Sequence, residues 1–140
     1  MNRKTRTEIL IKGPVSVPQK LAREILSRYE VRTIEDANNG LVMIKVREGA
    51  KQSLFYIGEV LVTECKVMLN GCLGIGIVKG HEPELAYNLA VIDAAYNAGL
   101  AETKAWTSEL LLEEERIKKN DQDLTARILK TKVNFTTMDV

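Results

Sequence analysis

The residues best suited to chemistry in this sequence form one turn, Lys79-Gly80-His81, which precedes a helical pattern. Free backbone N–H groups and the positive end of a helix dipole bind anions, so this turn predicts an anion-binding site. Glu82 and Glu84 already place negative charge there, which weakens that interpretation. His81 is the only histidine of the chain, and a solvated surface side chain is its simpler interpretation.

The remaining reactive residue types do not combine into a catalytic or metal-binding set. Gly74, Gly76 and Gly80 give the spacing GxGxxxG, but the first two lie inside a predicted strand rather than in a strand-to-helix turn. Cys65 and Cys72 are the only cysteines, and their spacing is not that of a metal clip. We therefore expect no catalytic residue, no metal and no bound cofactor in this chain.

The elements that must position the turn form a central hairpin–helix core over residues 58–99. Apolar and polar residues alternate over 61–69 and again over 73–79, as in half-buried strands, and Asn70-Gly71 between them favours a tight hairpin. A nearly uncharged helical pattern runs from Pro83 to Ala98, and Gly99 supplies a C-terminal stop.

Two features of this core predict close contacts. Gly74 and Gly76 share one face of their strand, and a bare strand face allows another backbone to approach, so we interpret it as a contact surface within this chain or with a partner. Asp93 is the single acid in the middle of the helical pattern. It is either a partly buried carboxylate bonded to a backbone group or a polar residue at a subunit contact.

The chain before the core predicts a further helix and short strands. The basic residues among 1–6 are interpreted as a solvated terminus, and a helix is expected from Ser16 to Tyr29. A weak strand over 31–34, a turn at Asn38-Asn39-Gly40 and a strand over 41–47 follow, then a turn and a strand that begins at 54. The alternation over 41–47 predicts one face against a core and one in water. A bulge or bend is expected at Gly58.

After the core, residues 103–130 predict a helical arm, either one helix or two divided at Asn120-Asp121. Its apolar stripe is narrow, and exposed stripes of that kind mark association surfaces. Residues 132–138 alternate again and are interpreted as a terminal strand. We expect the arm and this strand to contact a partner through five side chains: Trp106, Leu110, Ile117, Phe135 and Met138.

These patterns together predict an α+β fold: a single domain over residues 1–140, with an antiparallel sheet of four to six strands packed by the central helix and flanked by other helices. With 20 basic and 19 acidic residues, the net charge of +1 gives no electrostatic case for nucleic acid or an anionic membrane. Two cysteines without a disulfide framework, and an N-terminal apolar core too short for a signal peptide, predict a cytoplasmic protein.

Four blocks of the sequence, in order, resemble the PhnG subunits of the bacterial carbon–phosphorus lyase system. The blocks are NNGLVMIKV; GEVLVTECKVMLNG with LGIGIVKG; the Ala-rich helix that ends LAVIDAA; and the closing VNFTTM. One departure follows Gly80, where relatives often have an Arg-Asp pair and this chain has His81-Glu82. That difference puts in doubt any anion-binding role attributed to the arginine.

The resemblance implies a cytoplasmic role in the use of phosphonates as a phosphorus source. Proteins of this family assemble with PhnH, PhnI and PhnJ into a core complex, which displaces adenine from ATP with a phosphonate with the help of the ATPase-like PhnL. ATP and the phosphonate are substrates of that complex, and the family implies no catalytic residue in this chain. Self-association is left open. The alternative is a stand-alone module that binds a small molecule or anion at the Lys79–His81 turn.

Overall fold

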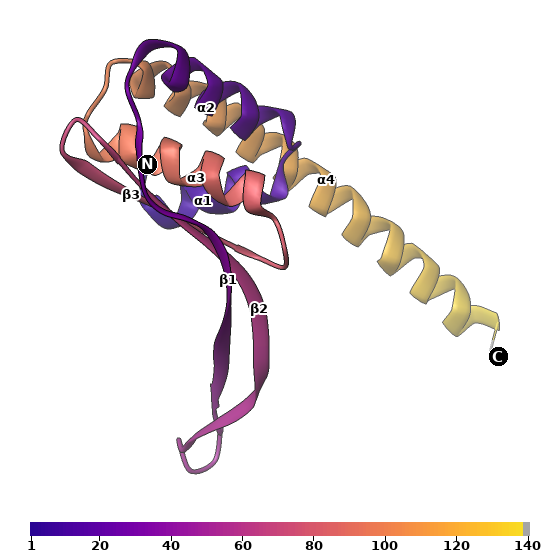
Figure 1. Ribbon diagram of the computed structural model, residues 1–140. Coiled ribbons are helices and arrows are strands. Elements are labelled where there is room, and N and C mark those ends of the chain that lie inside the picture. The colour runs from indigo at the N-terminus through magenta and orange to yellow at the C-terminus, as the bar shows by residue number, and fades with distance from the viewer. Residues whose placement is uncertain (139–140) are drawn as a thin grey trace.

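The computed structural model describes the backbone of residues 1–138 and the side chains of residues 1–130. Two helices come first, then three strands, then two more helices (Figure 1). Their bounds are α1 Arg3–Lys12, α2 Ser16–Arg28, β1 Arg32–Arg47, β2 Leu54–Leu69, β3 Cys72–Lys79, α3 Pro83–Asn97 and α4 Glu102–Met138. Helices on one face of an antiparallel sheet confirm the predicted α+β class.

The sheet is antiparallel with the order β1-β2-β3, and its three strands within residues 1–138 are fewer than the four to six expected. The predicted short strands are segments of two long ones. The turn predicted at Asn38-Asn39-Gly40 is wrong, because these three residues pair in regular register with β2, and a register shift lies just before them, between Glu35 and Asn38. A second shift confirms the bulge expected near Gly58: Gly58 and Tyr56 pair with consecutive residues of β1, which leaves Ile57 as the extra residue.

The hairpin between β2 and β3 and the helix after it form as the sequence predicts. Asn70 and Gly71 both have positive φ angles, 48° and 78°, as a two-residue hairpin turn requires. Helix α3 has its proline in the first turn, and Gly99 follows with a φ of 66°. A left-handed residue directly after a helix ends it at low cost when that residue is glycine.

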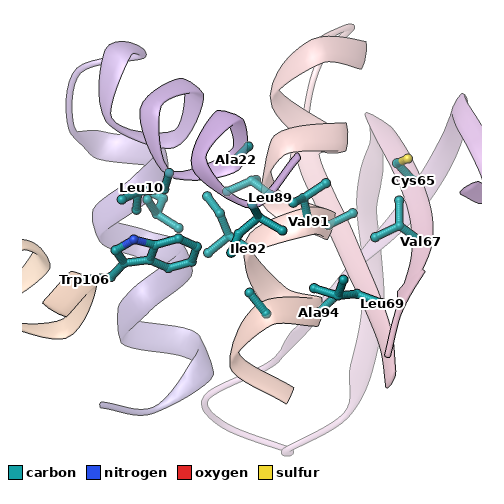
Figure 2. Close-up of a cluster of buried hydrophobic side chains, with 14 of the residues drawn as sticks. Leu10, Ala22, Cys65, Val67, Leu69, Leu89, Val91, Ile92, Ala94 and Trp106 are labelled. Atoms are coloured by element: carbon teal, nitrogen blue, oxygen red, sulfur yellow. The ribbon is translucent and has the colours of Figure 1, made fainter. Parts of the chain in front are cut away.

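Helix α3 is the middle layer of the molecule. One side packs on β2 and β3, and the other packs on α1 and α2, with α4 beyond. Figure 2 shows this arrangement, with Val67 and Leu69 of the sheet on one side of α3 and Leu10, Ala22 and Trp106 on the other. Buried on both sides, α3 has little need of a polar face, which explains its nearly uncharged sequence.

The backbone of α3 reaches β3 across the two bare glycines. A Cβ atom built on Gly74 would lie 2.6 Å from the Ala94 Cβ, and one built on Gly76 would lie 2.7 Å from the Ala90 nitrogen. The close approach expected at this face is confirmed, and the approaching backbone belongs to this chain. The two glycines are therefore covered by α3 and do not form an outer surface for a partner.

Helix α4 corrects the expectations for the C-terminal region. It is one helix of 37 residues, so Asn120-Asp121 does not divide it and residues 132–138 are not a strand. The sequence after Ala101 contains neither glycine nor proline, so nothing stops helix propagation once it has begun. The seven alternating residues 132–138 are too few to end a helix that already extends through the preceding turn. The side chains of Phe135 and Met138 lie outside the described residues.

The helices within residues 1–138 lack an apolar stretch long enough to cross a lipid bilayer. The apolar residues of α3, which come nearest to such a stretch in composition, are buried between the sheet and the other helices.

The contact at the glycines gives a test of the core. Gly76→Ala places a methyl group inside the contact distance of the α3 backbone, and overpacking of this kind should lower the free energy of unfolding by about 1–3 kcal/mol. Gly40→Ala is the matched control, because no atom lies within 4 Å of the position of its Cβ. Urea denaturation of both variants measures the difference, and equal stabilities would contradict the packing described.

Candidate functional site

A buried ionic cluster joins α1, β3 and α3 at Asp93, which is 4% exposed. Its carboxylate accepts hydrogen bonds from Arg6 Nη2 at 2.6 Å, from Arg3 Nη2 at 2.7 Å and from the Ile75 N–H at 2.9 Å. The Arg6 guanidinium also lies 4.2 Å from the centre of the Tyr96 ring, a cation–π contact. Of the two interpretations of Asp93, the structure supports the buried carboxylate bonded to backbone, because Asp93 does not reach an outer surface.

The arginines of this cluster correct the expectation that the basic N-terminal residues are solvated. They lie three residues apart on α1, so both side chains reach the same face of that helix. Burial lowers the pKa of the Arg6 guanidinium, and the Asp93 carboxylate opposes that change. The sequence did contain an indication of this contact. Asp93 is an isolated acid in an apolar helix and needs a cation, and Arg3 and Arg6 lie on one face of another helix. Because both arginines bond to the one buried carboxylate, the cluster holds α1 in place.

The turn predicted to bind an anion is organised by Thr63 of β2. Its Oγ1 donates to the Gly80 carbonyl at 2.6 Å and accepts from the Glu82 N–H at 2.9 Å, while the Gly80 N–H donates to the Leu61 carbonyl at 2.7 Å. Two backbone donors that an anion would use are therefore already occupied. Sequence reasoning missed Thr63, which reads as an ordinary buried residue of the strand.

The other two residues of the turn, Lys79 and His81, are both exposed. His81 is exposed, and its Nδ1 lies 3.0 Å from Asn39 Oδ1 on β1. Lys79 is exposed at the end of β3, opposite Val62 in the register. Of the three residues, His81 contacts Asn39 and the Gly80 N–H is bonded to Leu61. Anion binding here stays a prediction.

The residues with described side chains contain no group of three or more His, Cys, Asp or Glu that could hold a metal ion. Cys65 is buried and donates weakly from Sγ to the Glu35 carbonyl at 3.4 Å. Burial raises the pKa of the Cys65 thiol, which keeps it in the unreactive protonated form. A hollow between α1 and α4 is lined by the ion pairs Glu8–Lys12 and Glu114–Lys118. Four of its charged side chains are thus paired with one another, and Asp121 adds a further carboxylate to the lining.

The largest unpartnered surface lies on the hairpin of β1 and β2, which projects from the body (Figure 1). Every residue from 38 to 59 is exposed, including many large apolar side chains. We call the pair of segments 41–47 and 54–60 the distal ribbon. The prediction that one face of residues 41–47 packs on a core is wrong for this chain alone, since both faces are exposed.

The face of the distal ribbon that carries Leu41 and Leu61 is uncovered because α3 is short, whereas the face with Val42 and Val60 lies on the side of the sheet that α3 does not cover. With 15 residues it is about 22 Å long, whereas each 16-residue strand extends about 53 Å. Strand β3 likewise pairs with β2 only from Val62 to Leu69. Beyond Val62 the two long strands continue with no helix over them and no third strand beside them.

Helix α4 divides the predicted apolar stripe into a buried and an exposed part. Trp106 and Leu110 are 2% and 0% exposed, so the expectation that they form an outer surface is wrong. Trp106 Nε1 donates to Glu24 Oε2 at 3.0 Å, and its ring contacts Tyr96 with centroids 6.0 Å apart. Ile117 is partly buried beside the core. Farther along α4, Leu124 and Ile128 are exposed, so only this end of the stripe is available to a partner.

The ionic cluster can be tested by its asymmetry. Asp93→Ala leaves Arg6 buried without its counter-ion and should lower the free energy of unfolding by about 3–5 kcal/mol. Arg3→Ala removes a partner whose side chain is 57% exposed and should cost no more than about 1 kcal/mol. Chemical denaturation of the two variants checks the prediction. Equal, small losses would mean that Arg6 is not held by Asp93.

The two parts of α4 should respond differently to truncation. Trp106→Ala removes a fully packed ring and should destabilise the fold by about 3–5 kcal/mol. Leu124→Ala, at a side chain that is 57% exposed, should change stability by no more than about 0.5 kcal/mol. Thermal unfolding followed by circular dichroism distinguishes them. A folded, equally stable Trp106→Ala protein would contradict the burial of this ring.

Comparison with known proteins adds one finding. No curated protein matches the sequence. A family model described as "Phosphonate metabolism protein PhnG" matches residues 1–139, essentially the whole chain. The match covers the core, both flanking helical regions and the distal ribbon, and it agrees with the resemblance carried by the four sequence blocks. This chain belongs to the PhnG family of phosphonate metabolism proteins.

Proposed function

We propose that this chain is a non-catalytic subunit of a carbon–phosphorus lyase core complex. In that complex it supports the transfer of a phosphonate to the ribose C1 of ATP: a phosphonate oxygen forms the new bond to C1, the bond from C1 to adenine breaks, and adenine leaves. The product is a ribose 1-phosphonate 5-triphosphate. The PhnI-like subunit is the expected catalytic partner, with PhnH-like and PhnJ-like subunits in the same assembly and a PhnL-like ATPase assisting it.

The single observation that carries the proposal is the exposed apolar surface of the distal ribbon in a member of a phosphonate metabolism family. Contiguous apolar surface of that size on a protein in water marks a site of association. The polar groups of the body support the same conclusion, because Asp93, Arg6 and Thr63 are all engaged in holding elements together. A chain with its polar groups committed to structure and its apolar groups exposed is suited to assembly.

The reaction is tested by reconstitution. The PhnI-, PhnH- and PhnL-like subunits are incubated with ATP and methylphosphonate, with and without this chain, and released adenine is measured by chromatography. We expect this chain alone to release no adenine above background, and its omission to reduce release by the other subunits. Turnover by the isolated chain would overturn its non-catalytic role, and full activity without it would overturn its membership of the functional complex.

A further inference from the structure

We infer that the distal ribbon is inserted into a groove of a different polypeptide, whose floor is apolar and contains small residues and whose rim is acidic. This inference rests on the proposed function, because it assigns a surface and a partner chemistry to the assembly described there.

The ribbon has one face without charge. Cross-strand pairing places Val42 opposite Val60, Ile44 opposite Gly58 and Val46 opposite Phe55 on this face. Val42, Val46 and Phe55 are 48%, 38% and 46% exposed. We call this the uncharged face. Leu61 lies on the same side of the sheet as Thr63 and Cys65, which are buried on the side of α3. Val60 is the neighbour of Leu61 in the strand, so the uncharged face continues the side of the sheet that α3 does not cover.

The uncharged face contains two glycines, as does the part of the sheet that α3 covers. Gly40 and Gly58 have no atom within 4 Å of the position of a Cβ, whereas Gly74 and Gly76 are closely covered by α3. A bare strand position surrounded by β-branched residues allows close approach of another backbone. In this chain the occupant of such a surface is a helix with alanines at the contact, so a partner floor with small residues would pack here in the same way.

The opposite face carries apolar residues, one acid, Glu59, which lies opposite Met43, and two cations, Lys45 and Arg47, for which the described side chains provide no ion pair. Lys45 pairs with Tyr56 across the strands, and its Nζ lies 5.1 Å from the centre of that ring. Arg47 Nη1 donates to the Gln52 carbonyl at 3.3 Å. Residues 45–53 hold three cations, Lys45, Arg47 and Lys51, and one acid, Glu48. A partner that covers this face therefore fits best with acidic side chains at its rim.

The ribbon is exposed on both edges as well as both faces. Strand β1 has no partner on its outer side in the described sheet, and β2 loses its partner β3 beyond Val62. An isolated two-stranded hairpin is marginally stable in water, and uncovered edges invite pairing with another chain. The 22 exposed residues from 38 to 59 match the roughly 20–30 residues that each side of a standard protein–protein interface contributes.

These features favour a different polypeptide over a second copy of this chain. Two copies packed face to face through the uncharged face would leave the faces with Leu41, Met43 and Tyr56 exposed, at 65%, 55% and 59%. Packing through the opposite face would bring Lys45 and Arg47 of one copy towards the same residues of the other. Insertion into a groove covers both faces at once and provides the missing negative charge.

The test introduces a charge on each face of the full-length chain and measures assembly. The chain is co-expressed with the PhnI-, PhnH- and PhnJ-like subunits, and the affinity for the purified subunits is determined by biolayer interferometry. Val42→Lys should weaken binding at least about tenfold, as loss of a central interface contact does. Lys45→Glu should weaken it as well, because it places an acid against the acidic rim.

Matched controls use equally exposed positions on the body. Val15→Lys, at a side chain that is 61% exposed before α2, and Lys104→Glu, at an exposed lysine of α4, should leave the affinity within about twofold. Hydrogen exchange of the wild-type chain gives a readout that does not depend on the folding of a variant. Amides of residues 41–47 should exchange at least about tenfold more slowly in the assembly than in the free chain.

Each outcome decides between the alternatives. Binding by the wild type that is unchanged in Val42→Lys, with equal exchange of residues 41–47 in both states, overturns the insertion while the proposed function stands. A homodimer of the free chain that Val42→Lys separates overturns it in favour of a second copy. No binding of the wild type to any of the subunits overturns the proposed function, and the inference with it.

Discussion

The contact between α3 and the bare face of β3 is the constraint on which the rest of the structure depends. Gly74 and Gly76 bring the helix backbone close to the strand, with Ala86, Ala90 and Ala94 at the crossing. At this distance side chains of ordinary size do not fit, so the small residues on both the strand and the helix specify this packing. It fixes α3 as the middle layer, and the other helices then assemble on its outer side.

A helix buried on both sides imposes a cost on any charge it carries. Asp93 is buried in that position, and the arrangement is stable only because Arg6, Arg3 and the Ile75 N–H provide compensating partners. The same interactions attach α1 to the sheet and α3, since displacement of α1 would remove both arginines and leave the buried carboxylate without a cation. The ionic cluster is thus a consequence of the layer order, and its role is to hold the N-terminal helix in place.

The length of α3 also accounts for one of the two faces that we assign to assembly, and the other, uncharged face lies on the side of the sheet that α3 does not cover. The helix covers β3 and the adjoining part of β2, and beyond its reach the two long strands have nothing above or beside them. The body is therefore complete with its own core, while the distal ribbon consists of apolar strands without one. A partner that fills this role would extend the sheet's packing as α3 does within the chain.

The sequence by itself determined those features that depend only on residues close together in the chain. Asn70-Gly71 specified the hairpin through its positive φ angles, Pro83 and Gly99 bounded α3, and the bare face at Gly74 and Gly76 indicated close backbone contact. Four sequence blocks were also enough to indicate the family, which the match over residues 1–139 shows.

Only the tertiary structure decided which of these surfaces are covered, because burial depends on residues that are distant in sequence. The stripe of α4 gives the same periodicity at Trp106 and at Leu124, yet one side chain lies against α2 and α3 and the other in water. From the sequence alone Arg6 is interpreted as a solvated cation, whereas in the fold it bonds to Asp93, 87 residues away. The alternation over 41–47 specifies a strand but not what covers it. The limited reach of α3 leaves one face of this strand exposed, and the other face lies on the side of the sheet that α3 does not cover.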